Sequence, residues 1–181
     1  VNTDLVNKVV NIASRCSGFI KKRFDGKLST NCTEPALFQE FVDANVNIAE
    51  LYEAREYSKA MRAISALADK ANQYIDDKQP WVVAKQEGSD NELHAICSVG
   101  INLFYVIAAY LKPVVPHMVE KTEQFLNIGE LPWPNELTPL TDHVVNKFKP
   151  LLTRVDADKL AEMIEASKEN LTATKPAKVK T

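Results

Sequence analysis

The feature that most constrains the fold is one long apolar stretch, AICSVGINLFYVIAAYL, at residues 95–111. Its length is at the short end of what a membrane-spanning helix needs, which is about 20 apolar residues. It also contains the small or polar residues Ser98, Gly100 and Asn102. We therefore predict that a helix over 90–111 is buried at the centre of the protein and does not span a membrane.

The other apolar residues recur at helical spacing in several segments. We predict further helices at about 3–23, 35–53, 56–76, 113–126 and 156–170. In the last of these, Leu160, Met163 and Ile164 are expected to face inward. Only 5 glycines occur in 181 residues, and no strand-like alternation is long enough for a sheet. The sequence thus predicts an all-α helical bundle of five to six helices over residues 1–170, followed by a basic flexible tail or linker at 171–181.

The cysteines indicate a reducing environment. Cys16, Cys32 and Cys97 match neither the spacing of a metal knuckle nor a disulfide framework, so we expect reduced thiols in a cytoplasmic protein. His117 and Glu120 lie at i and i+3, but one such pair does not make a metal site in a bundle, and we expect both side chains on the surface. No pattern of catalytic residues and no phosphate-binding glycine loop is present, so no catalytic residue and no metal site are predicted.

Polar residues form an unusual stripe on the first predicted helix. Asn7, Asn11 and Arg15 lie four residues apart, and therefore on nearly the same side of a helix. Asparagine is a poor helix former, so these amides are expected to have partners, either a neighbouring loop or helix end, or a ligand. Trp81 follows Pro80 at the corner between two long helices. It either packs over the end of the bundle or offers a flat surface for an unstacked nucleobase.

A second tryptophan, Trp133, also stands beside prolines, in the sequence Pro132-Trp133-Pro134. No comparable polar stripe accompanies it, so we expect Trp133 to serve packing alone. The overall net charge of −2 gives no indication of a strongly basic nucleic-acid binder. Positive charge is nevertheless in excess over residues 1–27 and negative charge over 28–60, so a local patch could still meet phosphates.

Four segments together resemble the anticodon-binding domain of bacterial methionyl-tRNA synthetase, a class I aminoacyl-tRNA synthetase. They are VNKVVNIASR (6–15), GFIKKRFDG (18–26), PWVVAKQ (80–86) and ICSVGINLF (96–104). The resemblance implies a helical bundle of the class I anticodon-binding type that recognises the CAU anticodon of methionine tRNA. It implies that Trp81 stacks on the first anticodon base, a cytosine, and that Asn11 and Arg15 bond the edge of that base. Asn7 and Pro80 would shape the site.

The resemblance further implies a parent enzyme that joins methionine to tRNA with ATP and magnesium, and that carries zinc in its catalytic half. The catalytic signatures of class I synthetases are absent from this sequence, so we expect a fragment that is inactive alone and needs no cofactor. Its expected partners are the anticodon loop, the missing catalytic domain in cis, for which 127–170 is the candidate interface, and a second copy if the parent dimerises. Phosphate contacts are expected from Lys21, Lys22 and Arg23. The alternative is a helical protein-interaction module with Trp81 as its anchor.

Overall fold

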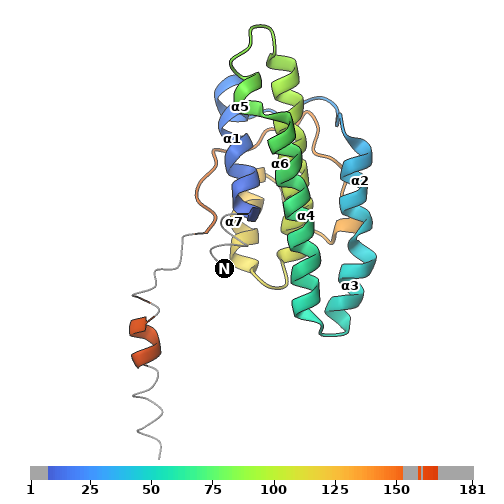
Figure 1. The fold of residues 1–181 in the computed structure, drawn as a ribbon, viewed down its shortest axis with the longest axis vertical. Coiled ribbons are helices and arrows are strands. Elements are labelled where there is room, and N and C mark those ends of the chain that lie inside the picture. Colours follow the sequence, from blue (N-terminus) through green and yellow to red (C-terminus); the bar gives the residue numbers. More distant parts are fainter. Residues whose placement is uncertain (1–7, 153–158, 160, 167–181) are drawn as a thin grey trace, which may run out of the picture.

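The computed structural model describes residues 8–152, 159 and 161–166 of the chain (Figure 1). Within them the predicted all-α class is confirmed, because the only β-type pairing is an isolated bridge between Lys27 and Val144. Between Asn11 and Leu126, six helices of 9 to 22 residues and one short helix of four residues follow one another. They are α1 (Asn11–Arg23), α2 (Pro35–Asp43), α3 (Asn45–Glu53), α4 (Tyr57–Lys78), α5 (Pro80–Val83), α6 (Asp90–Leu111) and α7 (Pro116–Leu126).

Helix α6 is the axis of the bundle, as the sequence predicts. Every residue from Ile96 to Leu111 is buried, and α1, α2, α4, α5 and α7 all contact this helix. Among the described helices, α6 alone is long and apolar enough to cross a membrane, yet 89% of its most apolar window is buried inside the bundle. The polar Asn102 on α6 is satisfied locally, since its amide donates to Ser98 O and Leu140 O and accepts from Leu140 N.

Helix α1 lies very close to α6, which fixes where its polar side chains emerge. A Cβ atom added to Gly100 would stand 2.6 Å from the sulfur of Cys16, a distance that real contacts do not allow. Cys16 and Cys97 are both fully buried and unoxidised. The hydrogen bond between Cys97 and Cys16, together with the burial of the site, raises the pKa of the Cys97 thiol far above its usual range. The thiols therefore act as small packing groups between the two helices.

The predicted single helix at 35–53 is wrong, because the chain breaks it into α2 and α3 at Ala44. The side chain of Asn45 donates to Val42 O at 2.8 Å and so competes with the backbone ladder of a continuous helix.

The inward orientation predicted for the last helix is also wrong where it can be examined. Residues 159 and 161–166 are helical, but Met163 is 64% exposed and Ile164 is 48% exposed. Leu160 lies outside the described residues, as do 167–170 and the predicted tail at 171–181. The apolar spacing of this segment indicates a helix, but Met163 and Ile164 do not belong to the hydrophobic core of the described residues.

Residues 127–152 are largely irregular and are tied to the helices by hydrogen bonds. A short 3-10 helix covers Pro134–Glu136. Leu28 N donates to His143 O and Val145 N donates to Gly26 O, both at 2.8 Å. This irregular segment therefore closes the bundle alongside α1, α6 and α7 (Figure 1).

Candidate nucleic-acid interface

Trp81 is held at one end of the bundle by a sharp change of chain direction. Helix α4 ends at Lys78, and Gln79 adopts a left-handed conformation with φ 46° and ψ 58°. The buried Pro80 then begins α5, a position where its missing N–H costs nothing. Trp81 is the next residue, and its side chain remains 37% exposed. The proline-broken corner thus presents a large aromatic ring at the surface instead of in the core.

Arg15 of α1 reaches this ring. Its guanidinium carbon lies 4.6 Å from the centroid of the Trp81 indole, within the range of a cation–π contact. One guanidinium nitrogen also pairs with the carboxylate of Asp76 on α4 at 2.5 Å. The arginine side chain is 23% exposed and that of Asp76 is 56% exposed, so the pair lies at the surface. The structure therefore brings together Arg15 and Trp81, two residues that the sequence places 66 positions apart.

Asn11 lies one helical turn before Arg15, on the same stripe of α1, and is half-buried. Within the described part of the chain its side-chain amide has no hydrogen-bond partner, whereas the amide of Asn72 on the facing helix donates to Lys8 O and Ala68 O. No hydrogen bond within the described residues therefore occupies the Asn11 amide beside Arg15. The remaining member of the predicted stripe, Asn7, lies outside the described residues.

The three basic residues predicted to meet phosphates have different surroundings. Lys21 and Lys22 are exposed and form no ion pair among the described residues. Arg23, in contrast, donates to the Asp90 carboxylate at 2.8 Å and to Ala84 O at 2.5 Å. It therefore ties the end of α1 to the loop that follows Trp81. The role of all three toward phosphate stays a prediction.

Sequence reasoning did not find the acidic partners of the stripe, although a signal for them exists. Lys8 and Arg15 stand seven residues apart on the first helical segment, and Asp69 and Asp76 stand seven residues apart on α4. In the structure Lys8 pairs with Asp69 at 2.9 Å, and Arg15 pairs with Asp76. Matching seven-residue spacings of opposite charge on two helices indicate that the helices lie side by side.

Burial raises the pKa of Tyr74 on α4 well above its usual range, with a smaller contribution from Glu34. Among the described residues no group of three or more His, Cys, Asp or Glu is placed to hold a metal ion. His117 and Glu120 form an exposed pair at 3.3 Å, as expected. The site as described is equipped for stacking and hydrogen bonding.

Comparison with known proteins defines the class first. Residues 26–169 match the family model described as the anticodon binding domain of methionyl tRNA ligase. Because this match covers most of the chain, the protein belongs to the family of methionyl-tRNA ligase anticodon-binding domains. The matched range includes Pro80 and Trp81 but begins after Asn11 and Arg15, so the placement of those two residues rests on the structure described above.

Solved structures of Mycobacterium tuberculosis methionyl-tRNA synthetase have the same fold. The apo form matches with a TM-score of 0.76 and 21% identity over 86% of this chain. Two complexes with methionyl-adenylate match with TM-scores of 0.74 and 0.75 and 22% identity over 84% of this chain. The chain spans about a third of those proteins, 33% of the apo form and 32% of each complex.

Proposed function

We propose that this chain recognises the CAU anticodon of methionine tRNA, and that Trp81, Arg15 and Asn11 carry the recognition. The observation that supports this proposal is the Arg15 guanidinium lying over an exposed indole at the tip of the bundle. An unstacked base gains about 1–3 kcal/mol from stacking on an aromatic side chain. Pro80 contributes as the first residue of α5, directly after the turn that ends α4. The ring of Trp81 is therefore presented on a short corner between the two helices.

Arg15 can serve the base without leaving Asp76. A guanidinium has five N–H donors in one plane, and the carboxylate of Asp76 uses only part of them. The remaining donors suit the ring nitrogen and carbonyl oxygen of a cytosine. Since Arg15 covers one face of Trp81, the base is expected on the other face or in the place of the guanidinium.

Asn11 complements Arg15 by supplying an acceptor. Its amide oxygen can accept a hydrogen bond from the exocyclic amino group of cytosine, which uracil lacks. Asn7 would extend the same stripe, and Lys21, Lys22 and Arg23 would contact the backbone. These assignments follow from the helical spacing of the stripe and from the exposure of the two lysines.

The parent enzyme is proposed to join methionine to its tRNA with ATP and magnesium in the cytoplasm, with zinc in its catalytic half. This chain would supply recognition and no chemistry, and needs no cofactor for that task. The interface with the catalytic domain in cis is proposed to lie on 127–170, where Trp133 lines a groove of about 510 Å³ together with residues of α3 and the start of α4. Tyr57, at 56% exposure, and Val114, at 45%, leave apolar surface uncovered beside this groove.

Binding of a CAU anticodon stem-loop, compared with one whose first anticodon base is changed, tests the proposal. We expect the wild-type chain to prefer CAU, and we expect Trp81→Ala to weaken CAU binding by about 1–3 kcal/mol in a fluorescence titration. Equal affinity of the wild type for both stem-loops would overturn the proposal. A protein partner lost on Trp81→Ala, together with indifference to RNA, would support a protein-interaction module instead.

A further inference from the structure

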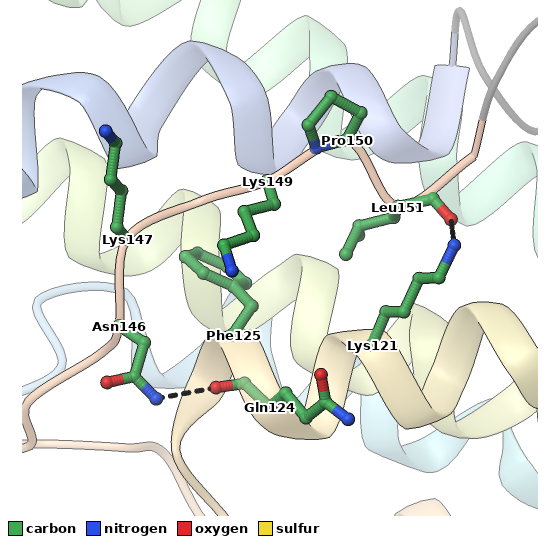
Figure 2. Close-up of a pocket in the computed structure, with 8 residues that line it drawn as sticks. All are labelled: Lys121, Gln124, Phe125, Asn146, Lys147, Lys149, Pro150 and Leu151. Carbon is green, nitrogen blue, oxygen red and sulfur yellow. Dashed lines mark hydrogen bonds between the residues drawn. The ribbon is translucent and has the colours of Figure 1, made fainter.

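A basic pocket lies on the flank of the bundle, between α7 and the segment 146–151 (Figure 2). Its volume is about 490 Å³, and its walls contain three lysines but no aspartate or glutamate. The lining residues are Lys121, Gln124, Phe125, Asn146, Lys147, Lys149, Pro150 and Leu151.

The segment that forms one wall is irregular but firmly held. Asn146 N donates to Phe125 O at 2.8 Å, and the Asn146 amide donates to Gln124 O at 2.7 Å. The ring of Phe148 packs edge-on against Phe125, with centroids 5.1 Å apart. These contacts also use carbonyl groups at the C-terminal end of α7, which would otherwise repel an anion. The lysines of the segment are therefore presented from a fixed backbone.

Two of the three lysines, Lys149 and Lys121, reach into the pocket from opposite walls. Figure 2 shows Lys149 extending from the segment toward α7 and Lys121 extending from α7 toward the segment, while Lys147 points away from α7 at the rim. Lys121 makes one long hydrogen bond to Leu151 O at 3.5 Å. None of these three lysines forms an ion pair among the described residues, unlike Lys8, which pairs with Asp69. Their positive charge is therefore uncompensated in this part of the chain.

The acidic side chains of α7 are directed elsewhere. Glu120 pairs with His117 at 3.3 Å, and Glu123 accepts from Leu131 N at 2.8 Å and lies 3.8 Å from the amine of Lys112. Each of these carboxylates thus has a partner outside the basic pocket.

A fourth lysine connects the pocket to the end of α1. Lys21 Nζ lies beside Gly26, since a Cβ atom added there would be 3.7 Å from it. Gly26 O in turn accepts a hydrogen bond from Val145 N, directly before the segment 146–151. A series of lysines therefore runs from the end of α1 to α7. We name it the lysine track, and it consists of Lys21, Lys147, Lys149 and Lys121.

We propose that the lysine track binds the phosphodiester backbone of the RNA outside the anticodon bases. This inference rests on the proposed function and extends its sequence-independent backbone contacts from Lys21 to the pocket beside α7. Lysine binds phosphate as a compact point charge, and backbone contacts position a nucleic acid without reading its sequence. An open pocket with cations on both walls and no acid suits a phosphate with its attached sugar. The competing reading is that Lys121 and its neighbours only balance the negative end of the α7 dipole.

The test uses the full chain with Lys121, Lys147 and Lys149 changed together to Gln. A matched control carries Arg55, Lys59 and Arg62 changed to Gln, which removes the same charge from three exposed positions at the α3–α4 end. Affinity for the CAU stem-loop and for the stem-loop with an altered first base is measured between 50 and 200 mM salt, and thermal unfolding is recorded for each variant.

The lysine-track variant is expected to bind both stem-loops about 10- to 100-fold more weakly at low salt. The slope of log affinity against log salt should fall by about 2, and the preference for CAU should be unchanged. If the lysine-track variant has the same salt slope as the control, the proposal is overturned, because the lysines then only balance the dipole of α7. This holds whether or not the thermal unfolding of the variant shifts. If the wild type does not prefer CAU, but the lysine substitutions still lower the salt slope, the anticodon assignment is overturned. The proposal for the lysine track then stands.

Discussion

The two tryptophans of this chain share a sequence context but have different surroundings. Both stand beside proline, yet Trp133 packs edge-on against Tyr110 at 5.5 Å and Tyr52 at 6.2 Å. Trp81 instead has the guanidinium of Arg15 over its ring and leaves 37% of its surface exposed. Proline only fixes the corner on which each ring is presented. The residues that meet the ring decide whether it serves the core or a ligand.

The environment of Trp133 is apolar as well as aromatic. Burial raises the pKa of Tyr52 to about 12, and its hydroxyl donates to Tyr110 O at 2.8 Å. Trp133 itself packs against the hydrophobic core, which confirms the packing role expected from the sequence. The end of the bundle around Trp81 carries charged groups in place of this aromatic cluster.

The largest expected effect that separates the two rings is on stability. Trp133→Ala removes aromatic packing from a half-buried site, so we expect the free energy of unfolding to fall by about 3 kcal/mol. Urea denaturation measures this change, and the preference for the CAU stem-loop should stay as in the wild type. A stable Trp133→Ala protein that no longer prefers CAU would reverse the roles assigned to the two tryptophans.

The next effect is on binding. Trp81→Ala should weaken binding to the CAU stem-loop by about 2 kcal/mol, because the base loses its stacking surface. Its cost in stability should be smaller than that of Trp133→Ala, at about 1 kcal/mol, because Trp81 is 37% exposed and its ring contacts the charged guanidinium of Arg15. Parallel titration and urea denaturation separate the two quantities. A stability loss as large as that of Trp133→Ala would assign Trp81 to packing.

A smaller effect is expected for Arg15→Lys. Lysine keeps the positive charge and can still pair with Asp76, but it lacks the planar set of donors. We expect the preference for CAU over the stem-loop with an altered first base to fall by about 1 kcal/mol. Arg15→Lys binding both stem-loops as the wild type does would remove Arg15 from base recognition.

The smallest effect is expected for Asp76→Asn. The carboxylate is 56% exposed, and surface ion pairs contribute little, so the free energy of unfolding should change by about 0.5 kcal/mol. The substitution should still alter the fluorescence of Trp81, because Arg15 is no longer held over the indole by its partner. Unchanged Trp81 emission would mean that Arg15 keeps its place without Asp76.

Much of the fold follows from sequence, because the apolar run of α6 is shielded from water when the other helices surround it at the centre of a bundle. The break at Ala44 could not be predicted, since it depends on one side-chain bond from Asn45 to Val42 O. For the candidate site, helical spacing placed Asn11 and Arg15 on one stripe. The contact of Arg15 with Trp81 and the pairing with Asp76 depend on how α1, α4 and α5 pack, which spacing along one helix does not contain.

The central claim is that the indole of Trp81 receives an unpaired anticodon base. With only two tryptophans in the chain, a Trp133→Phe background leaves Trp81 as the single indole reporter. Titration with the CAU stem-loop should quench its emission in a saturable way, because a stacked base lies directly on the ring. Saturated binding of the CAU stem-loop with unchanged Trp81 emission would contradict the account.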